Sequence, residues 1–278
     1  MPMNTSQPMQ IRDIAEAIVL SEDIDFKLTA LPETLEDSEP GPPLRIEKPG
    51  RPAELAPRPI REAQVPSVRG YHDPEQRPRI LHSFANHELQ AVELFAWALL
   101  AFPEASQSFR AGLLRILAEE QRHTRMYIAR LRKLGGEFGD YPVSGYFWNK
   151  TPQLTTPLRF ACAMSLTFEN ANLDHTRDSA AEILKSGDKK TAEVIEQVHL
   201  DEIGHVRFGW EWLGKLKDPE QTMWEAYCAN VTWPLRPALG RGRTFHRAGR
   251  EAAGMDPEFI RLLEGSQKSD PRDEEAHD

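Results

Sequence analysis

The chain has 278 residues and a formal net charge of -9 at pH 7, and 40% of its residues are hydrophobic. That length suits one main core with ordered extensions, and the acidic balance disfavours a general nucleic-acid binder while leaving a local basic patch open. The two cysteines, Cys162 and Cys228, exclude a disulfide framework and a cysteine zinc cluster, and both thiols suit a reducing cytosol.

The N-terminal region is expected to hold one short helix followed by an extended arm. It has neither a cationic lead nor a long apolar run, so we expect no signal peptide, no spanning helix and a cytoplasmic location. An amphipathic helix over residues 10–20 is predicted by apolar residues at helical spacing, namely Ile11, Ile14, Ala15 and Ile18. Nine prolines between residues 32 and 66 predict an arm that either wraps the core or is mobile, because proline fixes φ and lacks an N–H group.

Four long helices are expected next, each bounded by proline, glycine or a capping side chain. The first begins at Pro78 and stops before Pro103, and the second runs from near Ser106 to Gly135-Gly136. The third runs from Thr156-Pro157 to Ser186-Gly187, and the fourth from a cap at Asp188 to just before Asp218-Pro219. Short turns therefore join the helices into two hairpins, and a long crossover rich in glycine and aromatic residues joins the hairpins.

This pattern predicts an all-α fold, a four-helix bundle with one long crossover. We expect an N-terminal helix and Pro-rich arm over residues 1–77, the bundle over 78–217, and a C-terminal extension over 218–278. The extension carries a short helix over residues 221–231, an Arg-rich segment over 236–250 and a polar tail. A solvated basic loop is favoured over an anion site for the Arg-rich segment.

Each long helix carries an acidic residue, or an acid and histidine pair, in the middle of its apolar stripe. These residues, in chain order, are Glu88, then Glu120 with His123, then Glu169, then Glu202 with His205. Burying four carboxylates without compensation would cost on the order of several kcal/mol each. Two divalent cations would balance their charge. Carboxylate and imidazole ligands in this pattern predict a site for two iron ions, with Mn/Fe as the alternative.

The spacing of these residues supports a paired arrangement. Glu120 lies 32 residues after Glu88, and Glu202 lies 33 residues after Glu169. Equivalent ligands in two similar hairpins should be separated by similar lengths, so the intervals indicate that the hairpins match.

Other acidic residues compete for these roles. Glu93 is the alternative to Glu88, but it lies about 140° away around the helix, so Glu88 is preferred. Two further Glu-x-x-His pairs, Glu196/His199 and Glu274/His277, do not fit the stripes and are read as chance.

Three more residues are candidates for the surroundings of the site. Asp174 and Asp201 are candidates to accept hydrogen bonds from ligand histidines, with a solvated face equally favoured. For Tyr127, filling the core is favoured over lining a cavity.

The four strings HELQAVEL, EEQRHTRMY, LTFENANLD and HLDEIGHVRFG resemble the ligand helices of the ferritin-like superfamily. Glu88-Leu-Gln-Ala91 resembles the first-helix signature of rubrerythrins, in which the glutamate is a metal ligand. Most of the chain is similar to an uncharacterised bacterial ferritin-like family, although Ala171 stands where that family usually has arginine. A related group is the di-iron tRNA hydroxylases.

The resemblance implies a non-haem di-iron oxidoreductase or monooxygenase with O2 as co-substrate and a small organic substrate. By resemblance, Glu120 and Glu202 would bridge the metals and carry the catalysis, and Glu88 and Glu169 would be terminal ligands. A ferroxidase or iron-handling protein, a tRNA-modifying hydroxylase and a metal-stabilised binding bundle are the alternatives. Hydroperoxidase activity is less favoured because the chain has no Cys-x-x-Cys pair. The electron donor and the oligomeric state stay open.

Overall fold

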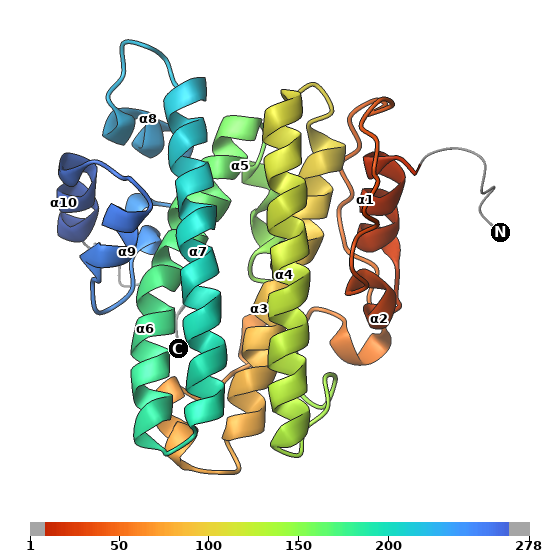
Figure 1. Cartoon of the computed structure of the whole chain (residues 1–278), viewed down its shortest axis with the longest axis vertical. Coiled ribbons are helices and arrows are strands. Elements are labelled where there is room, and N and C mark those ends of the chain that lie inside the picture. The colour runs from red at the N-terminus through yellow and green to blue at the C-terminus, as the bar shows by residue number, and fades with distance from the viewer. Residues whose placement is uncertain (1–8, 267–278) are drawn as a thin grey trace. The chain divides into compact units, whose positions relative to one another are not determined.

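The computed structural model describes residues 9–266, and this part of the chain is all-α, without a strand (Figure 1). The fold class expected from the sequence is therefore confirmed. The α-helices are α1 (Ile11–Leu20), α2 (Ile24–Lys27), α3 (Arg77–Ala101), α4 (Gln107–Lys133), α5 (Pro157–Ala163), α6 (Asn170–Lys185), α7 (Lys189–Leu216), α8 (Met223–Asn230), α9 (Arg247–Ala252) and α10 (Pro257–Gly265). A π-helical segment, Met164–Glu169, joins α5 to α6. The pair Glu274/His277 and the polar tail lie outside the described residues.

The described chain divides into two compact units. The first contains residues 9–63, 82–129 and 137–149, and the second contains residues 64–81, 130–136 and 150–266. The expected division at residues 77 and 217 stays a prediction.

The core of the first unit is the hairpin of α3 and α4. Phe84 packs edge to face on Tyr127, with ring centroids 5.5 Å apart, and Arg110 donates to the carbonyl of Leu99 at 2.7 Å. Because the partner number falls as the α3 residue number rises, the two helices run antiparallel. Gly135, with φ of 85°, follows α4 in the left-handed conformation expected of a closing glycine.

The Pro-rich arm packs against this hairpin. Trp97 donates from Nε1 to the carbonyl of Ile46 at 3.0 Å, and Arg110 binds Asp37 at 2.6 Å. Of the two alternatives for the arm, wrapping the core is therefore the one observed. The expectation of a purely extended arm was wrong in detail, because Ala53–Leu55 and Ile60–Glu62 form 3-10 turns.

The second unit is built on the hairpin of α6 and α7, which lie side by side in Figure 1. The side chain of Asp188 caps α7 by accepting from the Thr191 N–H at 3.0 Å, and Gly187, with φ of 86°, precedes it. Tyr71, from a 3-10 segment Val68–His72, donates to Asp188 at 2.8 Å. Gly187 and Asp188, which the sequence indicated as the closing residue and the cap, therefore set the turn of this hairpin.

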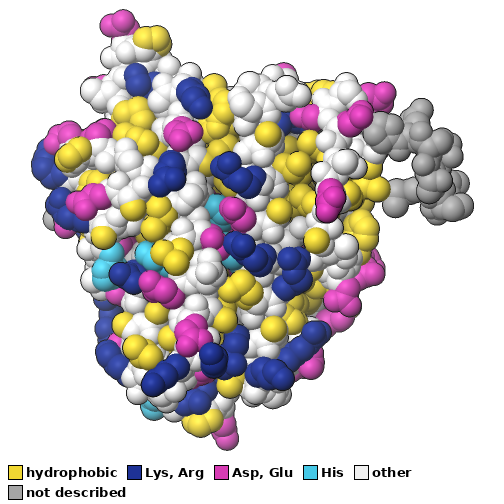
Figure 2. All heavy atoms as spheres, viewed as in Figure 1, with side chains coloured by type: hydrophobic (Ala, Val, Ile, Leu, Met, Phe, Trp, Pro, Cys, Tyr) yellow, Lys and Arg dark blue, Asp and Glu magenta, His cyan; other side chains and the backbone are white. Residues whose placement is uncertain are grey.

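The C-terminal part of the second unit contains α8, α9 and α10. The predicted helix over residues 221–231 is observed as α8, which begins with a capping box between Thr222 and Glu225. The other two helices were not predicted individually, and α10 begins at a cap, Asp256, followed by Pro257. No described helix has the length and apolar character needed to cross a membrane. Figure 2 shows Lys and Arg interspersed with Asp and Glu over the face drawn.

Candidate metal centre

The first unit brings together three of the predicted ligands. Glu88 comes from α3, and Glu120 and His123 come from successive turns of α4. His123 Nδ1 lies 3.4 Å from Glu120 Oε2 and 3.8 Å from Glu88 Oε2. All three side chains are buried, with Glu88 the most accessible at 6% exposure. We call Glu88, Glu120 and His123 the first triad.

The second unit contains a triad of the same composition. Glu169 ends the π-helical segment, and Glu202 and His205 lie on α7. His205 Nδ1 lies 3.3 Å from Glu202 Oε2 and 3.8 Å from Glu169 Oε1. These residues are also buried, with Glu169 at 5% exposure. We call Glu169, Glu202 and His205 the second triad.

The two triads are built alike on their hairpins. In each, a Glu-x-x-His pair on one helix meets a glutamate from the preceding helix, and the corresponding distances differ by 0.1 Å or less. The structure therefore brings the predicted residues of each hairpin together. Whether all six residues act as metal ligands stays a prediction.

The electrostatics of the first triad favour a bound cation. Burial raises the pKa of Glu88 well above its ordinary value, and the negative charge of Glu120 raises it further, while His123 lowers it in part. Two carboxylates held this close in a buried site cannot both ionise cheaply. A cation placed among them would remove that cost.

The donor set fits a metal ion by its chemistry. Each triad presents carboxylate oxygens and an imidazole nitrogen within 4.8 Å of one another, which is the ligand set that iron and manganese accept in helical bundles. In the second triad, Glu202 Oε2 is buried and has no hydrogen-bond partner among the described residues. A buried oxygen of this kind needs a partner, and a metal ion would supply it. These buried Glu/His clusters can therefore hold metal ions.

A π-helical turn delivers Glu169 to the second triad. Within Met164–Glu169, Thr167 donates from Oγ1 to the carbonyl of Cys162 at 2.8 Å, five residues back along the chain. Gly209 of α7 faces this turn so closely that a Cβ there would lie 2.4 Å from Cβ of Ser165. Single π turns inside α-helices are frequent at functional sites. The sequence analysis expected one continuous helix here and missed the turn.

Glu93, the rejected competitor of Glu88, has a different role. Its carboxylate accepts from Lys27 at 2.7 Å, from Arg51 at 2.7 Å and from the indole of Trp148 at 2.9 Å. Burial alone would raise the pKa of Glu93, but the positive charges of Arg51 and Lys27 outweigh burial and lower it. The choice of Glu88 is consistent with this, and Glu93 forms a buried ion cluster that we call the Glu93 cluster.

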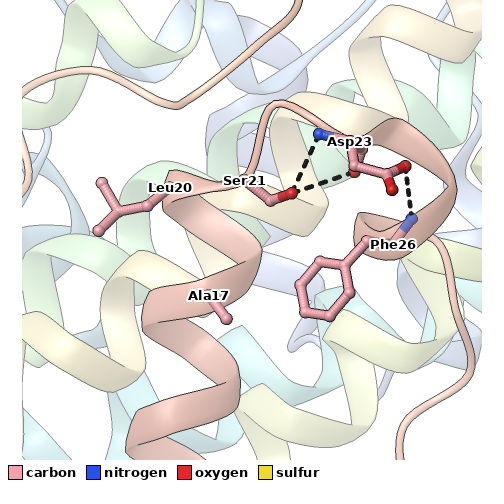
Figure 3. A pocket seen from close by; sticks show the side chains of 5 residues that line it. All are labelled: Ala17, Leu20, Ser21, Asp23 and Phe26. Carbon is pink, nitrogen blue, oxygen red and sulfur yellow. Dashed lines mark hydrogen bonds between the residues drawn. The ribbon is translucent and has the colours of Figure 1, made fainter. Parts of the chain in front are cut away.

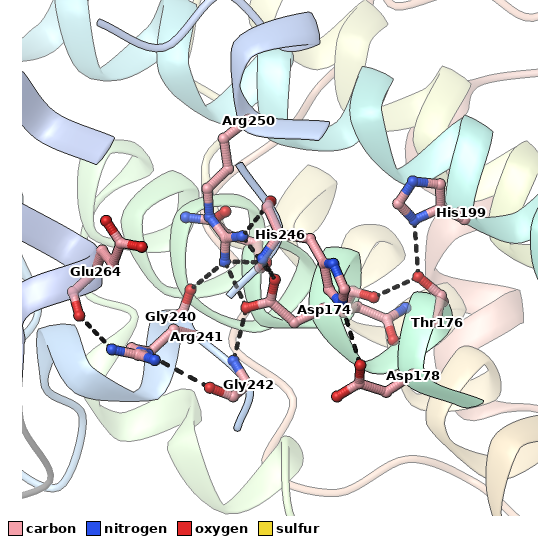
Figure 4. A network of polar contacts seen from close by, with 12 residues as sticks. Asp174, Thr176, Asp178, His199, Gly240, Arg241, Gly242, His246, Arg250 and Glu264 are labelled. Carbon is pink, nitrogen blue, oxygen red and sulfur yellow. Dashed lines mark hydrogen bonds and ion pairs between the residues drawn. The ribbon is translucent and has the colours of Figure 1, made fainter. Parts of the chain in front are cut away.

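Asp174 was a candidate either to support a ligand histidine or to lie on a solvated face, and neither reading was right, because Asp174 is buried against an arginine. Figure 4 shows its carboxylate facing Arg250, which binds it at 2.8 and 2.9 Å. The backbone N–H groups of Gly242 and His246 complete its partners at 2.8 and 2.7 Å. The carboxylate therefore ties the loop before α9 to α6.

The same network corrects the reading of the Arg-rich segment 236–250 as a solvated loop. Arg250 is fully buried, with its guanidinium 3.9 Å from the ring centroid of Phe245, and Arg241 donates to the carbonyl of Glu264 (Figure 4). Arg243 and Arg247 are exposed, and Arg247 pairs with the Glu264 carboxylate. Part of the segment is therefore buried and bound to other residues of the second unit.

The remaining candidates are placed as follows. His199, from the pair read as chance, lies outside the triads and contacts the Thr176 hydroxyl at 2.9 Å, while Glu196 pairs with Arg177. Tyr127 is buried against Phe84, as core filling requires. Asp201 accepts from Gln197, and its proposed support of a histidine stays a prediction.

A pocket in the first unit lies where α1 meets α2 (Figure 3). Its lining residues are Ala17, Leu20, Ser21, Asp23 and Phe26. The Asp23 carboxylate is used locally, because it accepts from the Phe26 N–H at 3.1 Å. None of the lining residues belongs to a triad, so the pocket is not part of the candidate metal centre.

Comparisons with known proteins identify a family but no activity. A family model described as "Protein of unknown function (DUF455)" matches residues 10–261. The chain is similar to an uncharacterized protein of Haemophilus influenzae, with 24% identity over 172 residues, which cover 59% of this chain and 58% of that protein. The match thus spans less than two thirds of the relative. No solved structure matches the chain.

Proposed function

This chain belongs to the DUF455 family of unknown function, and we propose that it is a di-iron protein that uses O2 to oxidise a small organic substrate. One observation carries the proposal. The same buried set of two glutamates and one histidine occurs twice, in the same order and at similar distances on the two hairpins. In ferritin-like bundles a ligand set duplicated in this way holds two metal ions, and the proposal extends that reading to this chain.

The charges of the ligands fit this assignment. Four carboxylates, from Glu88, Glu120, Glu169 and Glu202, would neutralise two divalent ions, and His123 and His205 would each supply a neutral nitrogen to one ion. The chemistry that a pair of iron ions supplies is one-electron redox change and the binding of O2. Manganese in one position is compatible with the same donors.

The residues of the chain would orient the metal ligands and exclude water, which such a reaction also requires. Both imidazoles turn Nδ1 toward the carboxylates of their own triad, which fixes the nitrogen available to a metal. Burial of all six side chains keeps bulk water away, so that reactive species are protected from side reactions. Adding one oxygen atom of O2 to a substrate and reducing the other to water would take two electrons and two protons from an external donor.

The parts of the chain outside the hairpins favour a substrate enzyme over an iron store. The arm is tied to α3 and α4 by buried side chains, and the crossover contributes the buried indole of Trp148. Cage-forming iron stores are usually near bare-bundle length. The additions are fixed to the hairpin by a few buried side chains, which suits the enclosure of an organic substrate.

The test is anaerobic titration with Fe(II), counting bound metal, followed by a pulse of O2. We expect two irons per chain, consumption of O2, and stabilisation of about 2.7 kcal/mol for each occupied site when free metal is about 100 times Kd. Glu120→Ala should lose bound iron and O2 consumption together. The control is Glu196→Gln, which removes the glutamate of a Glu-x-x-His pair that lies outside the triads and should leave both unchanged.

The other outcomes separate the alternative functions. Fewer than two irons per chain, or iron binding that does not depend on Glu120, would contradict the dinuclear assignment. Two irons without O2 consumption would identify a metal-stabilised binding bundle. Oxidation of many irons per chain would identify an iron-handling protein.

A further inference from the structure

The π turn that carries Glu169 is bound to the C-terminal extension by two hydroxyl groups. Thr167, two residues before Glu169, is fully buried and contacts the hydroxyl of Tyr227, on α8, at 2.9 Å. The Thr167 hydroxyl also donates to the carbonyl of Cys162 at 2.8 Å. Two hydrogen bonds in series therefore join α8, through the π turn, to the end of α5.

The direction of both hydrogen bonds follows from their chemistry. A carbonyl oxygen can only accept, so the single proton of the Thr167 hydroxyl points to Cys162. The Tyr227 hydroxyl must then be the donor in its contact with Thr167. Burial raises the pKa of Tyr227, so this hydroxyl keeps the proton that it donates. The contact therefore depends on a group that phenylalanine would lack.

The hydroxyl of Tyr227 is held against the π turn by its surroundings. The tyrosine is fully buried, and its ring packs on Phe259 of α10 with ring centroids 5.2 Å apart. The backbone of Gly240 lies so close that a Cβ there would be 2.9 Å from Tyr227 Oη and 3.1 Å from the carbonyl oxygen of Leu166. A side chain at Gly240 would displace one of these groups, so glycine permits the close approach. The extension thus meets the π turn at a side chain and at a backbone carbonyl.

The register of the π turn decides where Glu169 points. Successive residues of a helix are turned by about 100° around its axis, so a change of one residue in the hydrogen-bond register would rotate Glu169 by about that angle. The Oε1 atom of Glu169 lies 3.8 Å from His205 Nδ1, and such a rotation would take it away from that nitrogen. A π turn is rare and needs support from its surroundings. Thr167, bound on both sides, supplies that support inside the turn.

We propose that Tyr227 is a positioning residue for Glu169: by donating to Thr167, it holds the π turn in the register that directs Glu169 at the second triad. This inference rests on the proposed metal-binding function and gives the C-terminal extension a part in it. The extension would then control metal affinity without contributing a ligand.

The experiment is a titration of the metal-free chain with Co(II), followed by calorimetry and by the visible absorption of the bound ion. We expect the wild type to take up two ions. Tyr227→Phe should weaken Co(II) binding by about 10-fold and change the visible spectrum, because Glu169 is no longer held in place. Thr167→Val should do the same, whereas Thr167→Ser keeps the hydroxyl and should bind as the wild type does. The double variant should bind no more weakly than either single variant, since both remove one interaction.

A matched control separates this effect from a general loss of packing. Tyr71 is also fully buried, and its hydroxyl also meets a threonine, Thr191, at 3.1 Å. Thr191 lies 11 residues before Glu202 on α7, which is about three helical turns from the second triad. Tyr71→Phe should lower the temperature of thermal unfolding but leave the affinity for Co(II) and the visible spectrum unchanged.

The contrary outcomes are distinct. If the wild type binds two ions but Tyr227→Phe and Thr167→Val leave affinity and spectrum unchanged, or Tyr71→Phe alters them equally, the inference is overturned while the dinuclear site stands. Uptake of fewer than two ions by the wild type would overturn the proposed function itself, and the inference with it. Thermal unfolding of each metal-free variant establishes that it is folded. If Tyr227→Phe does not fold, the comparison of Thr167→Ser with Thr167→Val decides.

Discussion

The buried carboxylates of this chain fall into two kinds, those held by arginine or lysine and those gathered around a histidine. Glu93 and Asp174 belong to the first kind, since each is bound by a buried guanidinium at 2.7 to 2.9 Å. The triad glutamates belong to the second kind, with a carboxylate from a neighbouring helix and an imidazole as close neighbours. Burial alone therefore does not distinguish the two kinds of carboxylate, whereas the charge of the neighbouring side chains does.

The largest expected effect tests the first kind. Glu93→Gln should lower the free energy of unfolding by about 3–5 kcal/mol, because Lys27 and Arg51 would keep their buried positions without a counter-charge. Urea denaturation of the metal-free chain measures this. A change below about 1 kcal/mol would show that the Glu93 cluster is not a unit of stability.

The matched substitution in the second kind is Glu88→Gln. In the metal-free chain it should change stability by no more than about 1 kcal/mol, because burial and the charge of Glu120 raise the pKa of Glu88 and favour its neutral form, which glutamine resembles. With metal present, the same variant should lose the stabilisation that metal gives the wild type. If both variants behaved alike without metal, the distinction between the two kinds of carboxylate would fail.

A smaller effect is expected from a buried histidine that lies outside the triads. His82 is 1% exposed and accepts from the Gly139 N–H at 2.9 Å, and burial lowers its pKa to about 4 while Asp140 opposes this. Between pH 6.5 and about 4 the unfolded chain binds a proton that the folded chain does not. Stability should therefore fall as the pH falls, by up to about 1.4 kcal/mol per pH unit from this group.

The variant His82→Gln keeps an acceptor near Gly139 and removes the titration. Urea denaturation at pH 7 and pH 5 should show a shallower loss of stability in the variant than in the wild type. An equal loss in both would assign the acid sensitivity to other groups.

The smallest effect is expected at the exposed pair of Glu196 with Arg177, whose charged groups lie 2.9 Å apart. Glu196→Gln should cost less than about 0.5 kcal/mol, because water screens the pair. The same denaturation series measures it. A cost above about 1 kcal/mol would mean that surface and buried carboxylates differ less than proposed.

The sequence was informative wherever a local signal sets a boundary. Pro78, Gly135 and Asp188 place the ends of α3, α4 and α7 within a few residues, because their backbone or side chains act on their immediate neighbours. Helical periodicity decides which side chains share a face, and for the same reason it selected the residues that the structure brings together in each hairpin.

Features that depend on distant residues were missed. The partners of Glu93 include Lys27, Arg51 and Trp148, which are 66, 42 and 55 residues away along the chain. The pairing of Asp174 with Arg250 spans 76 residues. The π turn before Glu169 also lacked a local signal, because its sequence reads as ordinary helix. The partners of these carboxylates and the π turn are decided by tertiary packing, which local sequence does not encode.

The Glu93 cluster also has a consequence for the order in which the chain is synthesised. Lys27 and Arg51 leave the ribosome before Glu93, and Trp148 leaves it 55 residues after Glu93. Chains emerge at roughly 5–20 residues per second, so the N-terminal segment waits several seconds before its counter-charge is made. During that interval its cations remain in water, and α1, α2 and the arm cannot complete their packing. The residues of α1, α2 and the arm, although made before Glu93, thus reach their final positions only after it.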